Sequence, residues 1–507
     1  MAISSAVLLT LALGFIGVLS YYMLRHFTYW RSKGIPYIQT NPLFGLILPV
    51  LLRKRSMPEN TIAIYKACPG AKYYGSVDFG EPVLIVKDPE IVKDVTVKSF
   101  AHFPNHRAFF DEKFDPALSK NLFFLKDDRW RDMRSVLTPS FTANKMKYMF
   151  QLVSKCSMDF VQYLRERSEP TRDIDLKDFF TRYTNDVIAT TAFGISVNSV
   201  QNRENEFYTN ARASIFFEGF LNLIKFMVAR FFPKLMRFMG FGFLPKKCSR
   251  FFDQIICDTV KMRDEKGIVR PDMIHLLMQA RDNEKGIPMT NDDITAQAII
   301  FLLAGFDTSA RLMCFVSHVL SHHPDIQDQL RDEVDAILGQ DDGSISYEKL
   351  GSMKYLDMVI SETLRMYPPQ PFTDRVCTEA YELEASTPES KPFTVAPGTL
   401  VWIPTLGFHH DPKYFPEPEE FKPERFSEEN KNDIIPYSYL PFGIGPRKCI
   451  GDRFALMEAK IIIARLLQNF VFKPSEKTTK VITFARDGSI MSPENGFWMR
   501  LESRNKP

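Results

Sequence analysis

The sequence predicts a mainly α-helical protein with small peripheral β-sheets. Two observations support this fold class. The middle of the chain, from about Trp130 to Leu364, is patterned mostly as helices. Short β-like stretches occur on either side of it, near Ala71–Tyr74, Val83–Val86, Phe393–Pro404 and Lys480–Met499. A core of helices with short strands at its edges is typical of such a fold.

Composition narrows the class of protein further. The chain has 507 residues, of which 45% are hydrophobic and 25% are charged, as in a globular protein with a large core. The net charge of +3 is too small to indicate binding to nucleic acid. The seven cysteines are odd in number and scattered, which does not suggest a disulfide framework. We therefore expect most of the chain to lie in a reducing compartment.

The N-terminal residues predict a membrane anchor. Residues 1–24 carry no charged side chain and are long enough to span a bilayer, which takes roughly 20 residues. Arg25, Arg31 and Lys33 follow, so the positive-inside rule leaves the rest of the chain in the cytosol. A cleaved signal peptide would have a basic start and a shorter apolar run. The expected organisation is an anchor over 1–24, a basic linker or hinge over 25–45, and one catalytic domain over 46–507.

The segment Ile215–Leu244 is unusual in composition. It holds nine phenylalanines among several lysines and arginines, and Pro233 divides it into two pieces. One interpretation is a buried pair of helices. The other is a second contact with the membrane, in which basic side chains lie at the headgroups and aromatic ones dip into the lipid.

A long apolar helix is predicted at the centre of the chain. Thr290-Asn291-Asp292-Asp293 is typical of a helix N-terminus, and Pro324 ends the helical pattern after His323. The stretch Ala304-Gly305-Phe306-Asp307-Thr308 interrupts this pattern, because a glycine costs about 1 kcal/mol in a helix and a buried acid must be paired. Such a combination indicates either a functional site or an ordinary kink with a solvated acid.

Two further motifs are weak on their own. Glu362 and Arg365 are three residues apart on a predicted helix, a spacing that also suits a surface ion pair. Trp130 and Arg134 are four apart and share a helix face.

Cys449 has the most informative surroundings of any cysteine in the chain. It follows the glycine-rich stretch Pro441–Lys448, which ends in two cations, and precedes the helix-forming run Phe454–Lys460. Cations and a helix N-terminus favour the thiolate form, which binds metals. No second Cys or His lies at zinc-like spacing, so a four-ligand site is not expected. The remaining interpretations are an axial haem ligand and a buried structural cysteine.

The pattern Phe442-x-x-Gly445-x-Arg447-x-Cys449-x-Gly451 resembles the haem-binding signature of the cytochromes P450. Other motifs of that family occur in its order along the chain: Trp130-x-x-x-Arg134, Ala304–Thr308, Glu362-x-x-Arg365 and Pro423-Glu424-Arg425-Phe426. Together with the N-terminal anchor, the chain resembles a microsomal cytochrome P450, most like arthropod members of the detoxifying clan.

The resemblance implies a cytochrome P450 fold that holds haem b between the long central helix and the helix after the cysteine loop. It makes Cys449 the axial thiolate ligand. It makes Thr308 and Asp307 the residues that deliver protons to dioxygen through a water chain. The implied haem contacts are Trp130, Arg134, Arg375, Arg447, Ala304, Phe442 and Gly451. The implied structural support of the cysteine loop is Glu362, Arg365 and Arg425.

The implied activity is a monooxygenase that inserts one atom of O2 into hydrophobic xenobiotics, lipids or hormones. Electrons would come from NADPH through NADPH–cytochrome reductase, with cytochrome b5 as a further partner, at the cytoplasmic side of the endoplasmic reticulum membrane. Lys448, Arg129 and Arg131 are candidates for the reductase docking face. The candidate pocket segments are Ala101–Leu125, Ile215–Leu244, Phe301–Thr308, Pro371–Phe372 and Ile490–Met491.

Two other functions stay open. Haem-thiolate isomerases or dehydratases of peroxides need no reductase, but such relatives often lack the threonine that stands here at position 308. A non-enzymatic haem-binding protein would be expected to carry an output domain, and nothing in the chain resembles one.

Overall fold

The computed structural model describes residues 29–504 apart from short gaps, together with residues 10, 13, 14, 17, 20 and 21. The gaps are 109–111, 113–114, 167–172, 216–219, 233, 235–237, 239–241, 271, 283–288, 340–344, 487 and 489. Most of the predicted anchor therefore lies outside the described residues, and the division into anchor, linker and catalytic domain stays a prediction. The chain forms two compact units, which are described separately below. Unit 1 comprises 1–107, 371–414 and 435–447, and unit 2 comprises 108–370, 415–434 and 448–507.

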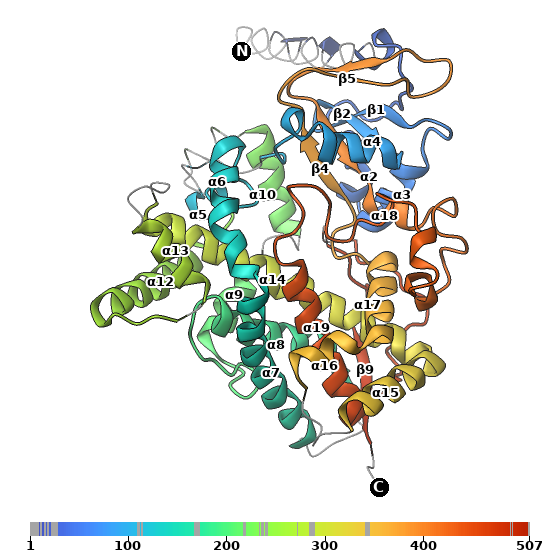
Figure 1. Ribbon diagram of the computed structural model, residues 1–507. Coiled ribbons are helices and arrows are strands. Elements are labelled where there is room, and N and C mark those ends of the chain that lie inside the picture. Colours follow the sequence, from blue (N-terminus) through green and yellow to red (C-terminus); the bar gives the residue numbers. More distant parts are fainter. Residues whose placement is uncertain are drawn as a thin grey trace, which may run out of the picture. The chain divides into compact units, whose positions relative to one another are not determined.

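Unit 2 is built mainly of α-helices (Figure 1). Its longer helices are α6 (Asp127–Leu137), α7 (Ala143–Glu166), α8 (Leu176–Thr191), α9 (Glu206–Ala213), α10 (Phe220–Phe231), α12 (Lys246–Lys266), α13 (Met273–Arg281), α14 (Asn291–His322), α15 (Pro324–Leu338), α17 (Lys354–Met366) and α19 (Asp452–Asn469). The described residues of unit 2 also form the short helices α5 (Pro116–Ser119) and α16 (Tyr347–Ser352). A small antiparallel sheet has the order β3 (Ile174–Asp175), β9 (Trp498–Ser503), β8 (Phe470–Pro474).

Unit 1 carries the larger sheet. Its strand order is β1 (Tyr73–Asp78), β2 (Glu81–Val86), β7 (Leu400–Ile403), β4 (Thr373–Val376). Only the β2–β7 pair is parallel. β5 (Tyr381–Leu383) and β6 (Phe393–Val395) form a hairpin, and the short helices are α2 (Leu48–Leu51), α3 (Met57–Lys66), α4 (Pro89–Lys93) and α18 (Thr405–His409). One face of the large sheet packs on a cluster of buried apolar side chains that includes Leu46, Ile64 and Trp402.

The predicted fold class is confirmed, although one predicted stretch is wrong and the strands β3, β4, β5 and β8 were not predicted. The stretches near residues 71–74, 83–86 and 393–404 contain strands, as expected. The stretch Lys480–Met499 is not a strand over most of its described residues. An isolated bridge joins Phe484 to Pro493, and β9 begins only at Trp498. The β-like composition of this stretch did not suffice, because a short strand also needs a partner of matching register.

The long central helix begins and ends as the sequence predicts. Thr290 caps α14 through a capping box with Asp293, and the helix continues without interruption through the Ala304–Thr308 stretch to His322. Among the described residues, α14 is the only helix long and apolar enough to cross a membrane, and its most apolar window is 67% buried. Such burial is typical of the core helix of a folded domain.

Gly305 lies where α14 packs against α8. A Cβ atom at this position would lie 2.9 Å from Cδ1 of Ile188. The glycine therefore permits close helix packing, and this contact accounts for its place inside a helix.

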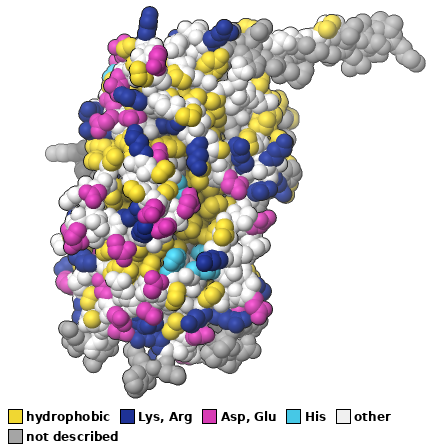
Figure 2. All heavy atoms as spheres, turned by 90° about the vertical axis from the view of Figure 1, so that its right-hand side faces the viewer, with side chains coloured by type: hydrophobic (Ala, Val, Ile, Leu, Met, Phe, Trp, Pro, Cys, Tyr) yellow, Lys and Arg dark blue, Asp and Glu magenta, His cyan; other side chains and the backbone are white. Residues whose placement is uncertain are grey.

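The surface mixes charges of both signs. On the face that Figure 2 shows, the described Lys and Arg side chains are interspersed with Asp and Glu side chains. In the segment Ile215–Leu244, residues Phe220–Phe231 form α10; Leu221, Phe232 and Phe238 on or after it are exposed, whereas Phe243 and Leu244 are buried. Exposed aromatic side chains do not fit the alternative of a fully buried helix pair at this segment.

Candidate functional site

Cys449 lies at the start of α19 in unit 2. Gly451 is the N-cap of this helix, and its backbone N–H acts on the sulfur to lower the pKa of the thiol. Cys449 is exposed in the described chain, yet the atoms packed around its sulfur raise the thiol pKa by desolvation, aided by Asp452 and opposed by Gly451, Arg134 and Lys448. The sequence predicted a lowered pKa, so desolvation outweighs the cations and the helix end. A metal ion would reverse this balance, because a coordinating thiol loses its proton outright.

The glycine-rich turn before Cys449 belongs to unit 1. Gly443 and Gly445 have φ angles of +69° and +75°, in the left-handed region that favours glycine. A Cβ atom at Gly445 would lie 2.1 Å from the carbonyl oxygen of Thr96, so no larger residue fits there. Phe442 is half-buried at the start of this turn.

Unit 1 also contains two of the arginines that the resemblance implies as haem contacts, Arg375 and Arg447. Arg375 is 1% exposed, and its guanidinium donates to carbonyl oxygens of Asp374 and Ile444. Its Nε has no partner among the described residues, and desolvation lowers its pKa to about 10. Arg447 donates to the Pro104 carbonyl and to Asn105 Oδ1. Arg375 is thus a buried cation without a carboxylate ion pair in the described chain, which is a costly arrangement unless an anion binds it.

Unit 2 places a partly buried cation, Arg134, near Cys449. Trp130 is buried on α6, one turn before Arg134 on the same helix. Desolvation lowers the pKa of Arg134, while Cys449 and Asp452 oppose this shift. Arg134 makes no ion pair with the described residues. A group that brings carboxylates, such as haem with its two propionates, would supply the missing anions, so the cations of each unit fit haem.

The central turn of α14 presents a hydroxyl and a fixed acid. The Thr308 hydroxyl donates to the carbonyl oxygen of Ala304, and both residues are accessible in a helix that is otherwise mostly buried. Asp307 is buried and pairs with Arg311 at 2.6 Å and with Lys177 at 3.8 Å. Arg311 in turn donates to the Met491 carbonyl. The buried acid is therefore paired, and the kinked helix with a solvated acid is excluded.

Glu362 and Arg365 form a buried pair, contrary to the simpler expectation of a surface one. Both side chains are fully buried, and the guanidinium bonds both carboxylate oxygens at 2.7 and 2.9 Å. Glu362 also accepts from Arg425 Nε at 3.3 Å and from the Lys422 backbone N–H at 3.0 Å. Arg365 reaches the Glu420 carbonyl. This network ties α17 to the 3-10 turn Pro423–Phe426 within unit 2.

Sequence reasoning missed the cations that hold Asp307. Arg311 lies four residues further along the same helix, a spacing that does signal an ion pair. Lys177 starts a different helix, and no local signal connects it with Asp307. The structure thus brings Thr308, Asp307, Lys177 and Arg311 together in unit 2.

Comparison with known proteins gives a consistent result. The sequence model described as "Cytochrome P450" matches residues 36–500. The chain is 44% identical to "Cytochrome P450 9e2" of Blattella germanica over 99% of both chains. It is 39% identical to "Probable cytochrome P450 9f2" of Drosophila melanogaster over 94% of this chain and 95% of that protein. It is 37% identical to "Cytochrome P450 6j1" of Blattella germanica over 90% of both chains.

Proposed function

Since the chain belongs to the cytochrome P450 family, whose monooxygenases hold haem through a cysteine thiolate, we propose that Cys449 is this ligand. One observation carries the assignment. Cys449 lies two residues before Gly451, the N-cap of α19, and its sulfur interacts electrostatically with the cations of Arg134 and Lys448. A helix N-terminus and a cation both stabilise a thiolate.

We propose that the remaining site residues hold and surround the haem. Bound haem supplies the binding and activation of O2, which amino-acid side chains cannot supply. The cations pair with its propionates, and the indole N–H of Trp130 donates to one of them. Phe442, Gly451 and Ala304 contact the macrocycle. The proposed propionate partners are Trp130, Arg134, Arg375 and Arg447.

Thr308 and Asp307 are the proposed proton-delivery residues. The hydroxyl of Thr308 is accessible and can donate to dioxygen when its bond to the Ala304 carbonyl is exchanged. Asp307 is held by Arg311 and by Lys177, and Lys177 is partly exposed. This lysine supports a route for protons between the buried carboxylate and solvent.

Replacing Thr308 by alanine is expected to uncouple the reaction. Electron consumption should continue, while peroxide release rises at the expense of oxygenated product, because the oriented hydroxyl is lost. The measurement is the ratio of product and peroxide to NADPH consumed. Thr308→Ser keeps a hydroxyl at the same position and should keep most of the coupling. Equal coupling in the wild type and Thr308→Ala would contradict the role.

The family takes O2, a hydrophobic substrate and electrons from a redox partner. We assign the electron supply to NADPH–cytochrome reductase, assisted by cytochrome b5. The candidate docking cations are each paired with an acid: Arg129 with Glu112, Arg131 with Asp128, and Lys448 with Asp452. A partner with an acidic face would have to exchange these pairs, which weakens docking and makes it sensitive to salt.

The proposed location is the endoplasmic reticulum membrane, with the catalytic part in the cytosol. The uncharged residues 1–24 and the basic residues that follow support this topology. Deleting residues 2–24 is expected to move part of the protein into the soluble fraction after cell lysis. The exposed apolar side chains around α10 should retain the rest. Full retention of the truncated protein would show that the N-terminus is not the anchor.

The proposed substrates are hydrophobic xenobiotics, lipids or hormones. Turnover assays with reductase and NADPH over a broad compound panel test this class. A haem-thiolate isomerase or dehydratase would instead convert peroxides without reductase. The presence of Thr308 beside the accessible Ala304 turn favours the oxygen-activating enzyme.

A further inference from the structure

The hydroxyl of Thr184 on α8 forms a buried hydrogen bond to the central helix α14. Thr184 is 0% exposed, and its Oγ1 lies 2.7 Å from the carbonyl oxygen of Phe306. The carbonyl of Thr181 in its own helix is a second acceptor, at the longer distance of 3.1 Å. A hydroxyl has one proton to donate, so the geometry favours the shorter contact to α14. A carbonyl oxygen has two lone pairs and can accept this bond in addition to its helical one.

Phe306 lies on the back of the turn that carries the proposed proton-delivery residues. An α-helix turns by about 100° per residue, so Phe306 lies about 200° around α14 from Ala304, while Thr308 lies about 40° from it. Ala304 and Thr308 are accessible, whereas Phe306 is buried against α8 and α9. The hydrogen bond from Thr184 therefore supports the turn from the side opposite to its accessible face.

This turn of α14 needs support because its own helical structure is weak. Gly305 has a low helix propensity, and Thr308 bonds back to the carbonyl of Ala304, which weakens and bends a helix. The accessible face of the turn contributes little burial to its stability. Support therefore comes from the back of the turn, where α8 contacts it through Thr184 and Ile188.

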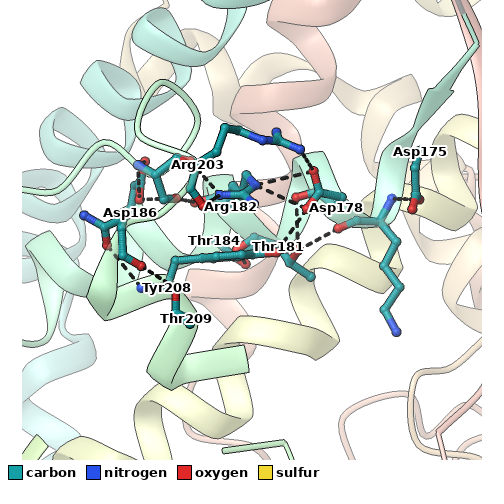
Figure 3. Close-up of polar contacts among 12 residues, drawn as sticks. Asp175, Asp178, Thr181, Arg182, Thr184, Asp186, Arg203, Tyr208 and Thr209 are labelled. Atoms are coloured by element: carbon teal, nitrogen blue, oxygen red, sulfur yellow. Dashed lines mark hydrogen bonds and ion pairs between the residues drawn. The ribbon is translucent and has the colours of Figure 1, made fainter. Parts of the chain in front are cut away.

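A polar network joins α8 to α9 beside this contact (Figure 3). Tyr208 of α9 packs its ring on Phe306, with the ring centroids 5.9 Å apart. Its hydroxyl lies 3.2 Å from the hydroxyl of Thr181 and donates to Asp178 at 3.3 Å, and the guanidinium of Arg182 lies 4.0 Å from its ring centroid. Networks whose members are hydrogen-bonded make a core more rigid, so the α8 side of the contact is held in place.

We propose that Thr184 is a positioning residue for proton delivery. Its bond to the Phe306 carbonyl fixes this turn of α14. The Thr308 hydroxyl then stays on the accessible face, and Asp307 stays paired with its cations. Thr184 transfers no proton itself and acts through Thr308. This inference rests on the proposed role of Thr308, and hydrogen exchange tests it separately from that role.

Hydrogen exchange of the full-length holoenzyme tests the structural part. Thr184→Val keeps the shape of the side chain and removes its hydroxyl. The backbone amides of residues 306–311 should then exchange about tenfold faster, because the closed form of this turn loses one buried hydrogen bond. The amides of residues 312–321, in the same helix, should exchange at the wild-type rate. Unchanged exchange over 306–311, or an equal rise along the whole helix, overturns the proposal.

Coupling of the reaction tests the functional part. Thr184→Val should release about threefold more peroxide per NADPH consumed, because a displaced hydroxyl is a poorer donor than an aligned one. The substrate dissociation constant and the Soret band of the reduced, CO-bound form should stay as in the wild type. Thr184→Ser keeps the hydroxyl and should restore the wild-type ratio.

Thr191→Val is the matched control. Thr191 is buried on the same helix, and its hydroxyl donates to the carbonyl of Val187 within that helix. The same substitution there should leave both the exchange of residues 306–311 and the coupling unchanged. An effect of Thr191→Val equal to that of Thr184→Val overturns the proposal.

A double variant shows whether Thr184 acts through Thr308. Adding Thr184→Val to Thr308→Ala should raise peroxide release no further, since the hydroxyl that Thr184 positions is already gone. An additive rise overturns the proposal, as does wild-type coupling in Thr184→Val when Thr308→Ala is uncoupled. If Thr308→Ala itself stays coupled, the proposed proton delivery fails, and the exchange rates alone decide whether Thr184 holds the turn.

Discussion

Replacing Cys449 by alanine is expected to abolish the strongly red-shifted Soret band that the reduced, CO-bound protein should show. This band reports a thiolate bound to haem iron, and alanine offers no ligand. The expected loss is complete, because the sulfur is the only protein atom that we assign to the iron. The measurement is the reduced CO difference spectrum of purified protein, with haem content determined in parallel.

Cys257→Ala provides the matched control, because Cys257 is an exposed cysteine on α12 to which we assign no function. It should keep the band at full height. Retention of the band in folded Cys449→Ala would refute the ligand assignment. Loss of the band in both variants would point instead to general damage to the protein.

Replacing Glu362 by alanine is expected to destabilise the protein by about 3–5 kcal/mol, which is a large part of the stability of a typical domain. The fully buried Arg365 would lose the carboxylate that its Nε and one of its Nη atoms reach. Arg425 and the Lys422 backbone N–H would lose the same partner. The free energy of unfolding, or the thermal midpoint where unfolding is irreversible, measures this effect.

Two controls separate burial of charge from loss of a contact. The double variant Glu362→Met/Arg365→Met removes both buried charges and should recover part of the lost stability. Asp328→Ala breaks the exposed pair with Arg331 and should cost less than about 1 kcal/mol. If Glu362→Ala costs no more than Asp328→Ala, the network does not support the cysteine loop as proposed.

The predictable parts of the fold were those with local signals. The cap at Thr290 and the end of α14 at His322 follow from residues within a few positions. Three strands of the large sheet, β1, β2 and β7, were predicted because their apolar runs are short and bounded, whereas β4 was not predicted. The stretch Lys480–Met499 failed, since its pairing depends on β3 and β8, which lie elsewhere in the chain.

The candidate site, too, has features that the sequence predicts and features that only the structure shows. Glycine-rich turns, the residues around Cys449 and the Glu362-x-x-Arg365 spacing could be recognised in the sequence. The raised pKa of the Cys449 thiol could not be recognised in the sequence, because desolvation depends on atoms that only folding brings near. The pairing of Asp307 with Lys177 and the lack of hydrogen-bond partners at the Glu458 carboxyl group could not be recognised in the sequence either.

The sequence alone thus determined the family, the fold class, the thiol that we assign to haem and the long helix beside it, because each depends on short contiguous patterns. The tertiary structure decided which charges are buried and what pairs with them: Glu362 with Arg365 and Arg425, Asp307 with Arg311 and Lys177, and Glu458 with no described group. The reason is physical. Burial and electrostatic interaction depend on distance in space, and a sequence specifies only distance along the chain.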